Sequence, residues 1–166
     1  MIRHKLRIAL LLRVMGTVAL VVAMTACATL PADAPQYSRA PEPAAGRTNV
    51  YIYRIGAYPT LRTPKISIDG AHIFDPPERS YTVVTLTPGD HEVRVKWSWD
   101  TGWPSLRFNI RVGSEPLYLK ISGSFVQHPG LSFEDAGSFA RVVPQVYAEP
   151  EIASCCRYTA PVTPNP

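Results

Sequence analysis

The chain has 166 residues, of which 46% are hydrophobic, and a formal net charge of +4. Four of its 17 basic residues lie before residue 14 without any acidic residue, so the remainder holds 13 basic and 13 acidic residues. A remainder without net charge removes the main support for nucleic-acid binding through a basic face. The length and apolar content fit one small domain with tails.

An apolar run from Val14 to Ala26 follows the basic residues and ends at Cys27. A basic start, an apolar stretch and small residues are typical of an export signal. Met24-Thr25-Ala26-Cys27 resembles the lipobox of bacterial lipoproteins, in which the cysteine takes up a diacylglyceryl group and the signal is cut off directly before it. This resemblance implies that residues 1–26 are a lipoprotein signal peptide and that Cys27 becomes an N-terminus carrying fatty acid, such as palmitate.

Two other interpretations of this stretch compete with the lipobox. A transmembrane helix needs about 20 continuous apolar residues, but Arg13 interrupts the run and leaves only 13 before Cys27. Ala26-Cys27-Ala28 also has the form cut by ordinary signal peptidase, which would release a soluble protein. For a lipoprotein, Ala28 in place of the aspartate that retains enterobacterial lipoproteins in the inner membrane favours the outer membrane, facing the periplasm.

Residues 27–47 are rich in proline and alanine and show no hydrophobic period. Proline-rich segments are stiff and extend by about 3.1 Å per residue. We therefore expect a lipidated tether that holds the domain up to roughly 60 Å from the bilayer.

Residues 48–158 show the alternation and turn signals of seven or eight short strands. Asp69-Gly70 separates two of them and favours a type I′ hairpin turn. Val93, Val95, Trp97 and Trp99 alternate with polar residues, which places one face of that strand inward. We predict an all-β antiparallel sandwich or open barrel. The expected strands cover residues 50–53, 65–68, 71–74, 81–86, 93–99, 106–112, 117–121 and 139–143.

The end of the chain is predicted to hold one short helix and a disordered tail. Pro150 to Cys156 is the helical candidate, with proline at the first position. Residues 159–166 are expected to be disordered. Tyr51 and Tyr53 alternate with apolar residues and are expected to form an outer face that this last segment covers.

Four short stretches carry a resemblance to known domains: VYIYR near residue 50, SIDG at 67–70, TPGDHEVRV at 87–95 and LYLKI at 117–121. Together they resemble a family of uncharacterised bacterial lipoproteins with a domain of unknown function. They are also similar to PEGA-type β modules, in which a DG hairpin precedes a PG-H strand. The resemblance covers roughly residues 48–158; it implies a β fold and an envelope address, and it implies no activity.

The sequence offers no recognisable catalytic or metal-binding set. His72, His91 and His128 lack the spacing of metal ligands, and no GxSxG marks a nucleophile elbow. His91 follows a turn, where we expect a solvated side chain. The acidic residues that we assign to turns rather than to chemistry are Asp69, Asp75, Glu78 and Asp90. We therefore expect no cofactor and no enzymatic activity.

Trp97, Trp99 and Trp103 are the suggestive aromatic group. If part of their face were exposed, the rings would stack on the sugars of a glycan or peptidoglycan or hold a peptide. The competing interpretation is a core position, because Val93 and Val95 share that strand face.

Cys155 and Cys156 are adjacent in an oxidising compartment. Neighbouring Cα atoms lie about 3.8 Å apart, below the usual disulfide range of roughly 4.4–6.8 Å. We therefore favour structural thiols, or bonds to other partners, over a redox-active pair. In either case we expect both residues to be dispensable for folding.

The leading functional hypothesis is a non-enzymatic, lipid-anchored protein of the cell envelope with a small β domain for interaction or structural support. Its expected partners are the membrane, through lipid on Cys27, and an envelope protein or the cell wall. The alternative is a glycan- or peptide-binding module that uses the three tryptophans.

Overall fold

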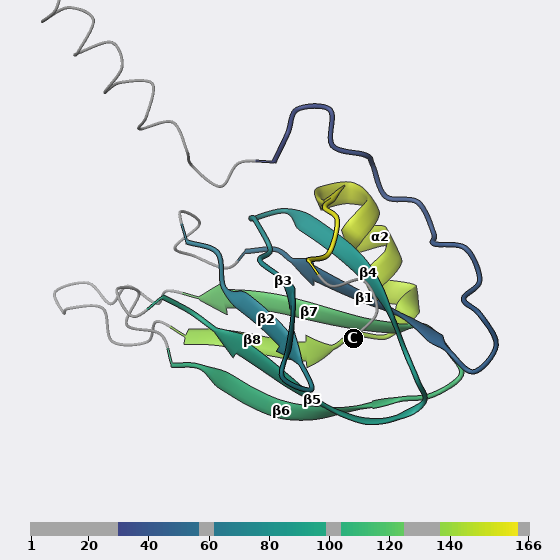
Figure 1. The fold of residues 1–166 in the computed structure, drawn as a ribbon. Coiled ribbons are helices and arrows are strands. Elements are labelled where there is room, and N and C mark those ends of the chain that lie inside the picture. Colours follow the sequence, from purple (N-terminus) through teal and green to yellow (C-terminus); the bar gives the residue numbers. More distant parts are fainter. Residues whose placement is uncertain (1–29, 57–61, 99–103, 125–136, 163–166) are drawn as a thin grey trace, which may run out of the picture.

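The computed structural model describes residues 30–56, 62–98, 104–124 and 137–162. Within these ranges nine strands form two sheets, and one helix, α2, covers the outer side of one sheet (Figure 1). The two sheets enclose a shared apolar core. The predicted all-β sandwich is confirmed.

The five-stranded sheet has the order β8-β7-β1-β4-β9. Its central strand β1 (Thr48–Arg54) pairs antiparallel with β4 (Ser80–Leu86) and parallel with β7 (Leu117–Ser124). At the edges, β8 (Gly137–Val142) pairs antiparallel with β7, and β9 (Arg157–Tyr158) pairs parallel with β4. The sheet is therefore mixed, whereas the sequence predicted antiparallel pairing throughout.

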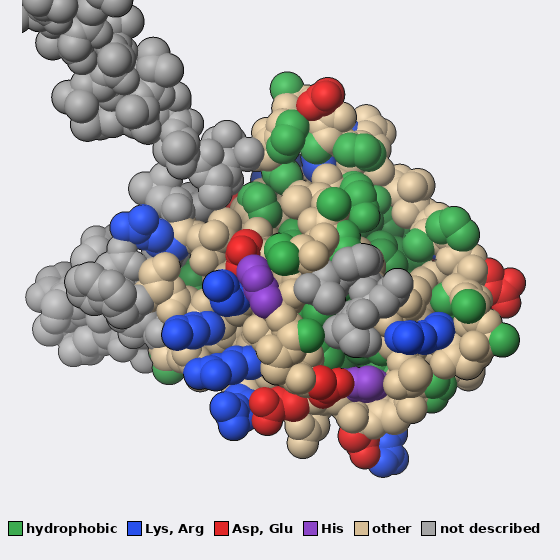
Figure 2. All heavy atoms as spheres, viewed as in Figure 1, with side chains coloured by type: hydrophobic (Ala, Val, Ile, Leu, Met, Phe, Trp, Pro, Cys, Tyr) green, Lys and Arg blue, Asp and Glu red, His purple; other side chains and the backbone are tan. Residues whose placement is uncertain are grey.

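The four-stranded sheet has the order β3-β2-β5-β6 and is antiparallel throughout. Its strands are β2 (Lys65–Ile68), β3 (Ala71–Phe74), β5 (Gly89–Lys96) and β6 (Leu106–Val112). The Asp69-Gly70 turn between β2 and β3 has φ angles of 51° and 83°, which confirms the predicted hairpin. On the outer surface, Lys and Arg side chains gather over β2, β5 and β6 (Figure 2).

Alternation along the strands decides which side chains enter the core. In β1, Val50 and Ile52 point between the sheets, while Tyr51 and Tyr53 point to the outer side and are buried there in a second cluster. Each buried apolar side chain contributes about 1.5–3 kcal/mol. The core between the sheets is formed mainly by Val50, Ile52, Ile66, Ile68, Ile73, Phe74, Val84, Leu86, Val93, Val95, Trp97, Ile110, Val112, Leu117, Leu119 and Ile121.

Helix α2 (Gln145–Cys155) lies over the tyrosines of the five-stranded sheet, which confirms that the last segment covers this face. Ala148 and Ile152 are fully buried and one turn apart, so they form the packing side of the helix. The expectation that Pro150 begins the helix is wrong: it lies inside, and Pro144 precedes the first turn. The burial of Ala148 and Ile152 outweighs the hydrogen bond that Pro150 cannot donate.

Residues 35–41, called the strap below, pack on the outer face of the five-stranded sheet. The expectation of a free tether is therefore wrong for this part of residues 27–47. The strap departs from proline-rich linker behaviour because Tyr37 and Ala40 join a buried cluster of tyrosines.

The expectation of a disordered tail from residue 159 onward is wrong for residues 159–162. The backbone N–H of Thr159 donates to the carbonyl of Tyr81 at 2.9 Å, and that of Val162 donates to Ile73 at 2.7 Å. These two hydrogen bonds connect the chain after β9 to β4 and to β3, so residues 159–162 are held against the domain. Residues 163–166 lie outside the described residues.

Candidate functional site

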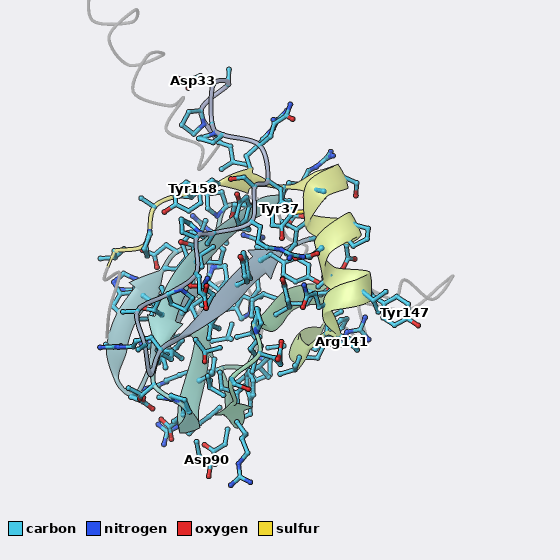
Figure 3. The ribbon with its side chains drawn as sticks, turned by 90° about the vertical axis from the view of Figure 1, so that its right-hand side faces the viewer. Asp33, Tyr37, Asp90, Arg141, Tyr147 and Tyr158 are labelled. Carbon is cyan, nitrogen blue, oxygen red and sulfur yellow. A yellow bond between two sulfur atoms is a disulfide. The ribbon has the colours of Figure 1, made fainter. Side chains whose placement is uncertain are left out.

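The strap contacts a row of tyrosines on the outer face of the five-stranded sheet (Figure 3). The ring of Tyr37, from the strap, lies 6.2 Å from that of Tyr51 and 5.4 Å from that of Tyr81. Tyr51 stacks on Tyr118 at 4.7 Å, and Tyr81 meets Tyr158 edge to face at 5.6 Å. Stacked and edge-to-face pairs of this kind add about 0.5–1.5 kcal/mol each beyond their burial.

Backbone hydrogen bonds fix the strap at both of its ends. The N–H of Ala40 donates to the hydroxyl oxygen of Tyr51 at 2.9 Å. The N–H of Tyr158 donates to the carbonyl of Pro35 at 2.8 Å. Because Tyr158 belongs to the last strand, the strap joins the two ends of the described chain across one sheet face.

Glu149 of α2 is the polar centre of this face. Its carboxylate accepts hydrogen bonds from the hydroxyls of Tyr37 at 3.1 Å and Tyr118 at 2.8 Å, and from Arg39 at 3.0 and 2.8 Å. The hydrogen bond from Arg39 is the main cause that lowers the pKa of Glu149 to about 2. Burial, together with Glu149, raises the pKa of Tyr37 to about 12. At neutral pH the site therefore holds one carboxylate among protonated tyrosines.

Glu151, on the same helix, makes a second link to the sheet. It accepts a hydrogen bond from Tyr53 at 2.7 Å and forms an ion pair with Lys120. Burial raises the pKa of Glu151, but the bonds from Lys120 and Tyr53 outweigh it and the net shift is downward. Both glutamates are ionised and bonded to side chains of the domain, so they fix α2 and the strap in place.

An open groove of about 430 Å³ runs beside the strap over β4 and β9. Its floor is formed by Tyr81, Val83 and Tyr158, and the strap prolines Pro35 and Pro41 form its side. The groove therefore lies where the strap and the sheet meet, with residues of both in its lining.

A disulfide joins Cys155 to Cys156 at the end of α2, with their Cα atoms 3.7 Å apart. This pairing differs from our favoured interpretation of free thiols or other partners. The structure brings the two sulfurs together where the helix ends, as Cys156 turns into an extended conformation. The cysteines lie beside Arg79 and Arg157 in a shallow pocket.

Trp97 is a core residue, which argues against its proposed role in ligand stacking. It is 3% exposed, and the buried guanidinium of Arg54 lies 5.1 Å from its ring centroid. Arg54 also donates to the carbonyl of Pro76 at 2.9 Å and forms an ion pair with Glu78 at 3.1 Å. Trp99 and Trp103, the other two predicted ligand-binding residues, lie outside the described residues.

His91 is bonded rather than solvated, contrary to our expectation. Its side chain is 11% exposed, with Nδ1 2.6 Å from Asp69 and Nε2 2.8 Å from the carbonyl of Thr87. Burial lowers the pKa of His91, but the bonds to Asp69 and Thr87 outweigh it and raise the pKa above 6.5. With acceptors at both nitrogens, the protonated ring is the favoured form. Across the described ranges, no three potential ligands cluster in a metal-binding arrangement, and His128 lies outside them.

Comparison of the chain with protein-family models, with curated proteins and with solved structures gives no match. The resemblance to lipoprotein and PEGA-type modules therefore stays a prediction. Cys27 lies outside the described residues. In the part of the chain that the structure describes, no helix has the length and apolar character of a membrane span.

Sequence reasoning missed Arg39, Arg54 and Glu149, the charged residues that organise these contacts. The available signal was weak: Arg54 ends a strand of apolar and aromatic residues, and Arg39 stands alone in a proline-rich stretch. Each becomes noticeable only when the fold places its partner beside it.

Proposed function

We propose that this chain is a non-enzymatic, lipid-anchored protein of the cell envelope, and that its β domain interacts with other envelope components. Lipid on Cys27 would attach it to the membrane, with the outer membrane favoured by Ala28. The strap supports the proposal, because it is the segment that connects the domain to the cysteine.

Pro35, where the strap meets β9, lies only eight positions after Cys27 in the chain. A fully extended chain of that length spans at most about 29 Å. The anchored domain would therefore lie within one domain diameter of the bilayer, instead of the roughly 60 Å expected for a free tether. A short connection that ends in a docked strap suits a protein that works near the membrane surface.

Metabolic labelling with a radioactive or alkynyl fatty acid tests the anchor. We expect label on the wild-type protein and none on Cys27→Ala. Cys155→Ala is the matched control, because it also removes one cysteine but leaves the proposed acceptor, and it should label as wild type does. An unlabelled wild type, or label that persists in Cys27→Ala, would contradict the proposal.

A further inference from the structure

Four exposed cationic side chains lie together on the outer face of the four-stranded sheet, on β2, β5 and β6 (Figure 2). They are Lys65, Arg94, Lys96 and Arg107, called the basic face below. Their strand neighbours Ile66 and Val95 point the other way, into the core. The alternation of the strands therefore holds all four charges on the same face of the sheet.

The register places these charges in like pairs. Lys65 is the direct cross-strand partner of Lys96, and Arg94 is the direct partner of Arg107. Like charges at directly opposed positions destabilise a sheet. Among the described residues, Glu92 offers the one counter-charge, at 3.7 Å from Arg107, and Lys65, Arg94 and Lys96 have no ion-pair partner there. The basic face therefore lowers the stability of the sheet that carries it.

The same two strands carry a complementary pair at their other end. Asp90 of β5 lies opposite Arg111 of β6, and two hydrogen bonds of 2.9 and 3.0 Å join them. Opposite charges at such positions are the stabilising arrangement. The contrast within one strand pair indicates that the like charges at the other end serve an external anion rather than the fold.

The position of the basic face within the sandwich narrows the kind of anion. The strap, which leads to the proposed anchor, lies on the outer side of the five-stranded sheet, whereas the basic face is the outer side of the other sheet. The two surfaces are therefore on opposite sides of the domain. This placement favours a partner that approaches from the side away from the strap over the bilayer that holds the anchor.

We propose that the basic face binds an anionic cell-wall glycan. Opposed side chains lie about 5 Å apart across the strands and alternate ones about 7 Å apart along β5, so a linear polymer with closely spaced carboxylate or phosphate groups can contact several of them at once. Arg94 and Arg107 present guanidinium groups suited to two-pronged recognition of such anions. The inference rests on the proposed function, which places the domain in the cell envelope. There the available polyanions are those of the cell wall rather than nucleic acid.

Co-sedimentation of the purified, lipidated protein with isolated cell-wall sacculi in detergent tests this proposal. We expect binding that weakens steeply with salt, and a roughly tenfold loss in Lys65→Gln, Lys96→Gln. The matched control is Arg141→Gln, Arg157→Gln, which removes two exposed arginines from the other sheet and should bind as wild type does. Equal loss in both double variants, or no loss in the first, would overturn the proposal.

The charge reversal Lys96→Glu separates binding from stability. It would pair residue 96 with Lys65, so we expect a higher melting temperature together with weaker sedimentation. A variant that is less stable and binds normally would overturn the assignment. A second experiment measures co-sedimentation with vesicles of phosphatidylcholine and phosphatidylglycerol. It uses a water-soluble form of the protein without lipid. Binding to these vesicles but not to sacculi would overturn the glycan in favour of an anionic membrane.

Fatty-acid labelling separates this inference from the proposed function. If the protein takes up label but does not bind sacculi, the lipid anchor is supported and only the glycan proposal is contradicted. If the protein binds sacculi through Lys65 and Lys96 but takes up no label, the role of the basic face is supported and the lipid anchor is contradicted.

Discussion

Arg39 and Glu149 lie 110 residues apart in the chain and form a two-pronged ion pair, with nitrogen–oxygen distances of 3.0 and 2.8 Å. The pair connects the strap, which precedes the first strand, to the helix that follows the eighth. Arg39 is largely exposed, so the ion pair by itself contributes little to stability. Its importance is positional, because Glu149 also holds two tyrosine hydroxyls that are partly buried.

We expect Glu149→Ala to lower the free energy of unfolding by about 1–2 kcal/mol, because the hydroxyls of Tyr37 and Tyr118 lose their charged acceptor. Urea denaturation followed by far-ultraviolet circular dichroism measures the change. Glu115→Ala is the control, since this exposed glutamate has no partner among the described residues and should leave the midpoint unchanged. Equal stability of the two variants would contradict the role of Glu149.

His91 and Asp69 give the domain a pH dependence with a defined sign. The folded-state pKa of His91 is raised above 6.5, so the stabilisation is complete below that pH and is lost as pH rises through the folded value. The pKa of Asp69 is lowered, chiefly by its bond to His91, so the same stabilisation is also lost at strongly acidic pH. We expect His91→Gln to be less stable than wild type at pH 6 and to approach it at pH 9.

Thermal unfolding of both proteins at several pH values measures this difference. The control is His72→Gln, because among the described residues the side chain of His72 bonds only to Asp75, three residues further along the chain. A difference between wild type and His91→Gln that is the same at pH 6 and pH 9 would contradict a protonated ring.

Arg54 is fully buried, and its pKa is lowered, mainly by burial and against the effect of Glu78. We expect Arg54→Met to destabilise the domain by about 3 kcal/mol, because Glu78 then loses its partner. The added change Glu78→Gln should restore part of this loss, since no unpaired charge remains. Double-mutant analysis by urea denaturation checks both values, and a strictly additive result would contradict the coupling.

The disulfide between Cys155 and Cys156 should contribute less than about 1 kcal/mol to stability, because adjacent residues close almost no loop. We expect the double variant Cys155→Ser, Cys156→Ser to have nearly the melting temperature of the wild type, and both proteins to run as monomers on non-reducing gels. A band of doubled mass in wild type that disappears in the double variant would show instead that the cysteines connect two molecules.

The strands could be predicted because their side-chain period is two and because their turns carry distinctive residues. Asp69-Gly70 marked the hairpin, and the alternation around Val93 placed Trp97 in the core as one of two interpretations. Tyr51 and Tyr53 indicated a covered outer face because large aromatic residues alternated with aliphatic ones in a single strand. In each case the information lies within a few neighbouring residues.

The rest depends on partners far apart in sequence. The strap has the composition of an extended linker, and partners far along the chain hold it in place: Arg39 bonds to Glu149, and Tyr37 packs on Tyr81. The basic face could not be predicted for a related reason. Equal numbers of acidic and basic residues after the first 26 do not show where these charges lie on the folded domain. Only the strand register reveals that Lys65 opposes Lys96.

The closure of the strap by late residues also sets an order of events during synthesis and folding. Pro35 and Arg39 emerge early, but Tyr158 and Glu149, which hold them, emerge near the end. The parallel partner of β1 likewise arrives only with β7, and such non-local pairings fold slowly, in milliseconds to seconds. Under the lipid anchor that we propose, the strap would therefore close only after Cys27 has emerged and become accessible to modification, and folding would then draw the domain toward its attachment point.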